Sequence, residues 1–165
     1  MREGHSAEGT TPLPDVDVAQ SVHVDATVEQ VWEYLADVRH LAQWSGNTVG
    51  VIGPERALRT GDSFVEIVRY LGIKSKQTYS VSAEPPNVMC WSLSRDGVGM
   101  AYEFRLRPDA RGTTLEGRGQ AVVPLGLGFF ASILKWSLRR QLAGDLTRLA
   151  RAVEQSGSSR RTSAK

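Results

Sequence analysis

Residues 125–156 read LGLGFFASILKWSLRRQLAGDLTRLARAVEQS, the longest uninterrupted helical pattern in the chain. Apolar side chains recur in it at steps of three or four residues, which places them on one face of an α-helix. Burying this face would contribute on the order of 10–20 kcal/mol before the cost of ordering the chain. The helix therefore requires a broad apolar partner surface. The face consists of Leu127, Ala131, Leu134, Leu138, Leu142, Leu146, Leu149 and Val153.

The first half of this helix carries a second apolar line, which includes Phe129, Ile133 and Trp136. A helix that is apolar around much of its circumference has apolar neighbours on more than one side. We therefore expect the first half to roof a ligand cavity and the second half, from Leu138, to close the hydrophobic core. The residues expected to face the ligand are Phe129, Phe130, Ile133 and Leu134.

Length and composition indicate one globular domain of 165 residues, with 41% hydrophobic and 23% charged residues. A net charge of +2 does not indicate a nucleic-acid surface. One cysteine excludes an intrachain disulfide, and three histidines without metal-ligand spacing predict neither a metal nor another cofactor. We expect a disordered arm over 1–15, a domain over 16–155 and a flexible basic tail over 156–165. Without a signal peptide or transmembrane run, the expected location is cytoplasmic.

The N-terminal half of the domain begins with an alternating strand over 16–25. Thr27 and Gln30 have capping-box spacing, which predicts a helix from there to Asp37, followed by a short helix that ends near Trp44. Six more strands are predicted, at 48–52, 63–71, 73–83, 88–94, 99–107 and 113–123.

The later strands can be paired from the sequence. A two-residue turn at 96–97 places Trp91 opposite Tyr102 and Met89 opposite Phe104, so that the large apolar groups share one face. A turn at 110–111 places Gly117 opposite Phe104, with opposite charges meeting across the outer face. Gly117 and also Gly119, which would lie opposite Tyr102, would allow sheet curvature or leave open space under the aromatic rings.

The hairpin over 63–83 is ambiguous, because the length of its loop at Gly72 decides which face is inside. A two- or four-residue loop turns Glu66, Tyr70, Gln77 and Tyr79 inward and the lysines outward. A three-residue loop would reverse one strand. The element order, one strand, two small helices, six strands and a long helix, predicts an α+β domain with a curved antiparallel sheet.

Several segments resemble the START-related (SRPBCC) superfamily, and within it the polyketide cyclase/dehydrase-like group. These segments are DATVEQVWEYLADVRHLAQW at 25–44, GDSF at 61–64, SAEPPNVMCWSLSRDG at 82–97 and GTTLEGRG at 112–119. The resemblance implies the helix-grip fold of the birch-pollen-allergen type, with about seven strands wrapped around the C-terminal helix and a ligand cavity between them. In the aromatase/cyclases of the group, a cavity arginine and a cavity tyrosine are implicated in the chemistry. Here the segment that matches the arginine position reads QTYSVSAE and has no arginine, and the segment that matches the tyrosine position reads NTVGV and has no tyrosine.

Among the inward-facing residues, Glu66 and Tyr79 are the candidate proton-transfer groups, because burial raises the pKa of a carboxyl and adapts it to acid–base work. Solvent exposure in another strand register is the alternative for Glu66. The expected ligand-binding residues in the sheet and the short helix are Trp44, Tyr70, Gln77, Met89, Trp91, Tyr102 and Phe104. A plain core position is the alternative for each aromatic residue and for Met89.

Three functions remain open at this point. The first is binding of a small hydrophobic or aromatic ligand, polyketide-like or lipid-like, in the central cavity. The second is a cofactor-independent polyketide cyclase/dehydrase. The third is a membrane-touching lipid carrier that uses the apolar patch at 129–136 and the basic residues around it. Both cavity functions require a space of roughly 300 Å³.

Overall fold

The computed structural model describes residues 15–95, 98–122 and 131–163. The strands are β1 (Val16–Val24), β2 (Thr48–Ile52), β3 (Ser63–Tyr70), β4 (Ile73–Glu84), β5 (Val88–Arg95), β6 (Val98–Asp109) and β7 (Gly112–Val122). The helices are α1 (Val28–Ala36), the short 3-10 helix η1 (Val38–His40), α2 (Leu41–Trp44) and α3 (Ala131–Ser163). The predicted capping box is confirmed, since Thr27 and Gln30 bond each other's backbone amides at the start of α1.

The seven strands form one antiparallel sheet in the order β1-β7-β6-β5-β4-β3-β2. The predicted pairing is confirmed where Trp91 opposes Tyr102 and Gly117 opposes Phe104. On the outer face, however, Arg118 bonds Asp17 of β1 rather than Glu103 opposite it. Arg105 bonds Glu103 on its own strand, because a long side chain reaches a diagonal or next-but-one partner as readily as the opposite one.

Two residues, Leu71 and Gly72, form the loop between β3 and β4, so Tyr70 pairs with Ile73. This register confirms the two-residue loop and turns Glu66 inward, opposite Gln77. Both loop residues have positive φ, +50° for Leu71 and +83° for Gly72, as a tight hairpin turn requires.

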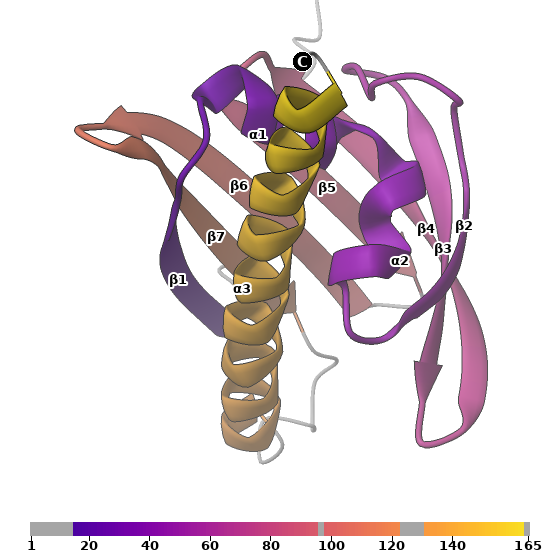
Figure 1. Cartoon of the computed structure of the whole chain (residues 1–165). Helices are drawn as coiled ribbons and strands as arrows, with labels where there is room; N and C mark the ends of the chain where they lie inside the picture. The colour runs from indigo at the N-terminus through magenta and orange to yellow at the C-terminus, as the bar shows by residue number, and fades with distance from the viewer. Residues whose placement is uncertain (1–14, 96–97, 123–130, 164–165) are drawn as a thin grey trace, which may run out of the picture.

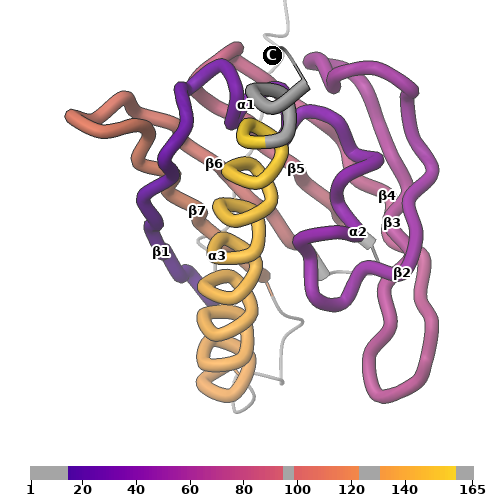
Figure 2. The backbone as a smooth tube through the Cα atoms, in the orientation of Figure 1, coloured from indigo at the N-terminus to yellow at the C-terminus, as the bar shows by residue number. Residues whose placement is uncertain are grey.

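The sheet curves around α3, which lies along its inner face with α1 and α2 beside it (Figure 1). The trace in Figure 2 shows the same arrangement, with the end of α3 near α1 and its start at the opposite end of the molecule. This is the helix-grip fold. The described residues of the apolar face of α3 lie in the core or against it, with Leu146, Leu149 and Val153 at most 1% exposed.

Glycines on β7 allow α3 to approach the sheet closely. A Cβ atom at Gly117 would lie 3.1 Å from both Cδ atoms of Leu146, and one at Gly119 would lie 3.2 Å from Leu138. Leucine side chains of α3 therefore fill the space beside these glycines. The prediction of open space under the aromatic rings is wrong at these two positions.

The structure begins α3 at Ala131 rather than Leu125, and residues 123–130 lie outside the described part. The helix continues to Ser163, beyond its predicted end at Ser156. Hydroxyl groups bond back to helix carbonyls there, from Ser156 to Val153 at 2.8 Å and from Ser158 to Glu154 at 3.0 Å, which is compatible with continued helix. Over the three described ranges, no helix is long and apolar enough to cross a membrane.

Candidate functional site

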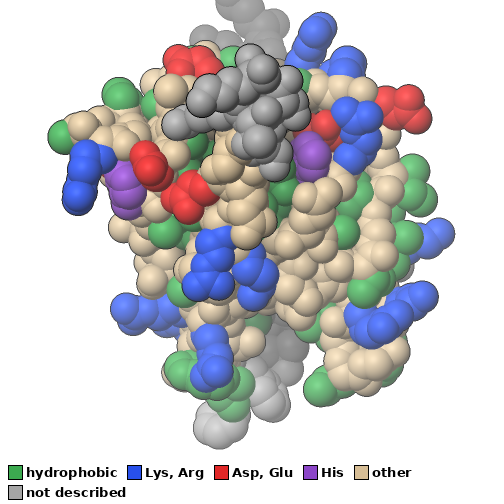
Figure 3. Space-filling model, viewed as in Figure 1, with side chains coloured by type: hydrophobic (Ala, Val, Ile, Leu, Met, Phe, Trp, Pro, Cys, Tyr) green, Lys and Arg blue, Asp and Glu red, His purple; other side chains and the backbone are tan. Residues whose placement is uncertain are grey.

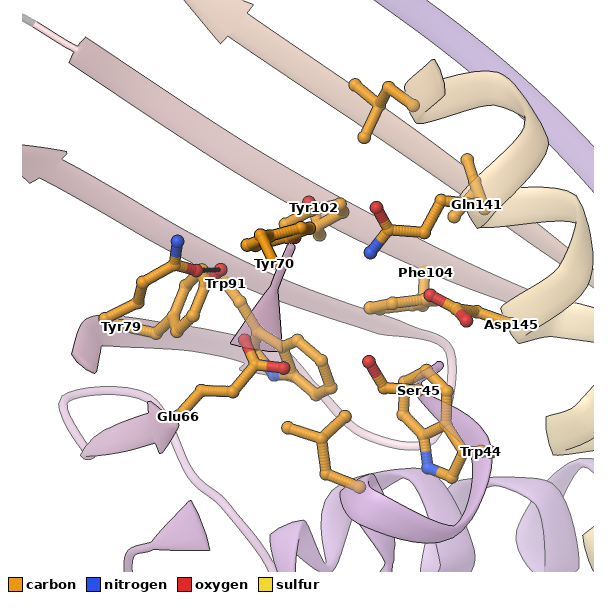
Figure 4. Close-up of a pocket in the computed structure, with 14 residues that line it drawn as sticks. Trp44, Ser45, Glu66, Tyr70, Tyr79, Trp91, Tyr102, Phe104, Gln141 and Asp145 are labelled. Atoms are coloured by element: carbon orange, nitrogen blue, oxygen red, sulfur yellow. Dashed lines mark hydrogen bonds between the residues drawn. The ribbon is translucent and has the colours of Figure 1, made fainter. Parts of the chain in front are cut away.

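A cavity lies between the inner face of the sheet and the middle of α3 (Figure 4). The sheet and the short helix contribute lining residues that the sequence predicted: Trp44, Glu66, Tyr70, Gln77, Tyr79, Trp91, Tyr102 and Phe104. The remaining lining residues were not predicted: Leu41, Ser45, Leu138, Gln141, Leu142 and Asp145. Four of these six come from α3, so residues 138–145 of that helix, rather than residues 131–134, cover the cavity.

The predicted ligand-facing residues at the start of this helix do not line the cavity where the structure describes them. Ile133 is 60% exposed, and Leu134 packs against the core outside the cavity lining. Phe129 and Phe130 lie outside the described residues. Met89 takes the alternative of a plain core position, since it is completely buried and does not line the cavity.

Aromatic rings form a continuous wall from α2 across the sheet. The Trp91 ring packs edge-on against Phe104 with centroids 5.0 Å apart, and against Phe64 at 5.3 Å. Trp44 lies 6.1 Å from both Trp91 and Phe104. Such rings present large apolar faces, while the indole N–H groups offer hydrogen-bond donors at their edges.

Glu66 is held inside the cavity by β3, where strand alternation places it between the buried Phe64 and Val68. Its carboxylate accepts a hydrogen bond from the Thr48 hydroxyl of the neighbouring strand. Burial raises the pKa of Glu66, although the hydrogen bond from Thr48 acts in the opposite direction. The carboxyl is therefore adapted to hold a proton and to exchange it with a ligand.

The tyrosines near Glu66 are neutral donors. The Tyr79 hydroxyl donates to Gln77 Oε1 at 2.9 Å, and its ring stacks on Phe64. Burial raises the pKa of both Tyr79 and Tyr102, so neither phenol ionises near neutral pH. They can orient a ligand oxygen, whereas Glu66 is better suited to remove a proton.

Asp145 approaches from α3 on the side opposite Glu66 (Figure 4). Its Oδ1 accepts the backbone amide of Gly46 at 2.9 Å and is paired with Arg148, whose Nε donates to the Trp44 carbonyl at 2.8 Å. Burial raises the pKa of Asp145, while these partners oppose the shift. Asp145 and Arg148 thus fasten the end of α2 to α3 at the cavity wall.

Trp91 carries an unpaired donor. Its side chain is 4% exposed, and its Nε1 atom is buried with no hydrogen-bond partner among the described residues. A buried indole N–H normally finds an acceptor, because leaving it unpaired costs free energy. An oxygen atom of a ligand in the cavity would supply one.

Residues 15–154 match the protein family described as polyketide cyclase / dehydrase and lipid transport. The chain belongs to this family. No curated protein sequence matches the chain.

Solved structures with the same fold include aromatase/cyclases. The di-domain ARO/CYC StfQ of the steffimycin biosynthetic pathway is 16% identical with a TM-score of 0.73; the match covers 87% of this chain and 52% of StfQ. This chain thus spans about half the length of StfQ. The Zhui aromatase/cyclase from Streptomyces sp. R1128 is 22% identical with a TM-score of 0.70, covering 84% of this chain and 93% of Zhui. TTHA0849 from Thermus thermophilus is 12% identical with a TM-score of 0.70, covering 86% of this chain and 97% of that protein.

The cavity of this family member has a volume of about 40 Å³, which holds a water molecule or two but is far below the 300 Å³ expected. Closely packed aromatic rings occupy the space in which the sequence predicted a larger ligand cavity. No lysine, arginine or histidine is among the described residues that line it.

The cavity adjoins a larger groove, of about 590 Å³, between the β3–β4 hairpin and α3. Tyr70 and Gln141 line both spaces. Tyr70 is 43% exposed, so its ring can move without disturbing the core. Displacing these two side chains would join the cavity to the groove.

Proposed function

We propose that the protein binds a small aromatic ligand carrying a carbonyl oxygen, with its rings in the cavity and the carbonyl bonded to Trp91. The buried, unpaired Nε1 of Trp91 in an aromatic-lined cavity is the observation that carries this proposal. Aromatic walls provide apolar contact, and a few placed polar groups set orientation. The closed cavity of about 40 Å³ is too small for such a ligand, so binding requires Tyr70 and Gln141 to move aside and join the cavity to the groove of about 590 Å³.

A matched pair of probes tests the hydrogen bond. The ketone 1-tetralone and the hydrocarbon tetralin have the same two-ring frame, but only the ketone has an acceptor oxygen. We expect 1-tetralone to bind at least about tenfold more tightly, because tetralin leaves the indole N–H unpaired. Isothermal titration calorimetry measures both affinities, and equal binding would contradict the proposal.

A matched pair of variants tests the location. Ser45 lines the cavity, whereas Ser80 is exposed on the outer face of the sheet. Ser45→Met places a flexible side chain in the cavity and should weaken 1-tetralone binding at least about tenfold. Ser80→Met should leave the affinity unchanged, and equal losses would place the ligand elsewhere.

The position of Glu66 favours a second candidate function, proton abstraction beside a ligand carbonyl. The carboxylate would take a proton from the adjacent carbon while the Trp91 N–H bonds the oxygen on which negative charge develops; the resulting carboxylic acid would return the proton. This step needs no cofactor and belongs to the chemistry of cyclisation and dehydration.

Deuterium incorporation at C2 of 1-tetralone in D2O measures this step by mass spectrometry. Glu66→Gln should lower the protein-dependent rate by about a hundredfold, the lower end of the range for a general base. Glu55→Gln, on an exposed loop, is the control. Incorporation that is unaffected by Glu66→Gln would exclude Glu66 as the base while leaving the binding proposal intact.

A further inference from the structure

Two short segments beside the groove expose large apolar side chains. The β3–β4 hairpin contributes Tyr70, Leu71 and Ile73, and the first turns of α3 contribute Ile133 and Trp136. Leu71 is fully exposed, Ile73 is 73% exposed and Trp136 is 64% exposed. Isolated exposed apolar residues are common, but a cluster at one end of a molecule indicates an interaction site.

Leu71 is unusual in backbone as well as exposure. Its φ of +50° is a left-handed conformation, which normally favours glycine or asparagine over a branched apolar residue. The side chain gains no burial in the folded chain to offset this conformation. A leucine at this tip is therefore better explained by contact with something outside the chain.

The same segments carry only positive charge. Residues 69–76 contain Arg69, Lys74 and Lys76, residues 133–140 contain Lys135, Arg139 and Arg140, and neither segment contains an acidic residue. The guanidinium of Arg140 lies over the Trp136 ring, 5.7 Å from its centroid. Basic groups thus accompany the exposed apolar groups on both sides of the groove.

Both segments lie at the same end of the molecule, as the hairpin tip and the start of α3 show in Figure 1. In the matching space-filling view, this end shows blue and green side chains, whereas red acidic side chains appear only toward the opposite end (Figure 3). We call residues 69–76 and 133–140 the basic apolar rim. Tyr70 belongs to this rim and also lines the cavity.

We propose that the basic apolar rim docks on a lipid bilayer surface that contains anionic lipid, with the hairpin tip and the first turns of α3 inserted at the headgroup level. Exposed Leu, Ile and Trp side chains partition into this region, and nearby Lys and Arg side chains are attracted to anionic headgroups. A rigid protein partner would need a surface that matches the shape of both protruding segments. A fluid bilayer surface adapts to them, so the two separate segments favour a bilayer. Docking would bring the cavity mouth at Tyr70 to the membrane.

Vesicle co-sedimentation of the full chain tests the proposal. We expect binding to phosphatidylcholine vesicles that contain about one third phosphatidylserine, and binding at least about tenfold weaker to pure phosphatidylcholine. Raising the salt to about 0.5 M should weaken the first interaction, because it screens the charges. If the rim instead binds an acidic protein, the chain will not sediment with either vesicle, and the proposal is overturned.

Two matched variant pairs locate the contact. Lys74→Glu/Lys76→Glu should lower the vesicle affinity at least about tenfold, whereas Arg107→Glu/Arg111→Glu, on the exposed β6–β7 hairpin, should change it less than about threefold.

Ile73→Thr and Ile52→Thr make the same change at exposed strand positions, and Ile52 pairs with Val65, away from the hairpin tip. Only Ile73→Thr should weaken binding, by about threefold or more. Equal losses within either pair would overturn the placement of the membrane contact on this rim. All four variants alter exposed residues, and thermal melting checks that each retains the fold.

Discussion

Glu66 is a buried carboxyl group that lies inside a cavity and between apolar neighbours on its own strand. Its neighbours on the inner face, Phe64 and Val68, are 2% exposed, and Glu66 itself is 8% exposed. A carboxyl kept there without a cationic partner in the described structure costs stability whenever it is ionised. Retaining that cost is consistent with a functional role for the group.

The pH dependence of stability should reveal this cost. In the unfolded chain Glu66 ionises near its ordinary pKa of 4.5, whereas burial raises its pKa in the folded protein. Its contribution is therefore fully favourable at low pH and is lost as the pH rises from about 4.5 through the raised pKa. Glu66→Gln removes this loss, so its free energy of unfolding relative to wild type should increase from pH 4 to pH 9, by about 1.4 kcal/mol for each unit between the two pKa values.

Urea unfolding of wild type and variant across that pH range measures the difference. Glu55→Gln, on an exposed loop, is the control. A difference between Glu66→Gln and wild type that does not change with pH would show that Glu66 is not desolvated in the folded protein.

At the level of single residues, strand alternation predicted the sheet side of the cavity well. The turn at 96–97 predicted Tyr102 on the inner face, whereas Glu66 and Tyr79 depended on the length of the loop at Gly72, which the sequence left open and the structure shows to be two residues. The polar lining residues of α3 were not predicted, because only the apolar residues of the helical pattern were considered. Gln141 and Asp145 nevertheless stand three residues after Leu138 and Leu142, on the same side of the helix. That spacing was the signal that could have identified them.

The contact between α3 and β7 depends on the two glycines of the strand. Gly117→Ala should destabilise the protein by about 1–2 kcal/mol, because the new methyl group would press on Leu142 and Leu146, which are packed against the sheet. Gly99→Ala is the matched control in β6, where the added atom would meet Val122 at an ordinary 3.7 Å. It should be neutral or stabilising by up to about 1 kcal/mol, as expected for replacing a strand glycine.

Urea unfolding measures the stability change of each variant as a shift of the midpoint, provided that the dependence of the unfolding free energy on urea concentration is unchanged. If Gly117→Ala is as well tolerated as Gly99→Ala, then α3 can shift outward without cost, and close approach does not hold the helix in place. That result would also favour a cavity that opens by movement of α3 rather than of Tyr70.

The residues of α3 before and after Ser137 show the limit of helical periodicity as a predictor. The pattern correctly placed Leu138, Leu142 and Leu146 against the sheet. It also predicted apolar neighbours for Ile133 and Trp136, in a cavity roof or at a membrane surface, and both side chains are exposed in the described structure. Periodicity identifies which side chains avoid water but does not say whether the chain itself, a ligand or an external surface covers them.

Some carboxyl groups of the molecule have lowered pKa values and others have raised ones. Stability therefore has a maximum between an acid limb, where it falls as the pH decreases, and an alkaline limb, where it falls as the pH increases. Arginine side chains and backbone amides hold the pKa of Asp62 at about 2, and the Arg111 amide together with His23 and Thr114 does the same for Asp109. A lowered pKa contributes stability above the unfolded value of 3.8 that is lost as the pH falls toward 2. Glu66 and Asp145 act oppositely, because burial raises their pKa values and stability falls as the pH rises.

The two limbs should therefore respond to different variants. Asp62→Asn/Asp109→Asn should reduce stability near neutral pH and approach wild type near pH 2, which flattens the acid limb. Glu66→Gln should flatten only the alkaline limb. Because the surface carboxylates share no bonding partner with Glu66, the changes should add within about 0.5 kcal/mol in the triple variant. Melting temperatures from pH 2 to pH 9 measure both limbs, and an alkaline limb altered by the surface variants would mean that the cavity and the surface carboxylates are energetically coupled.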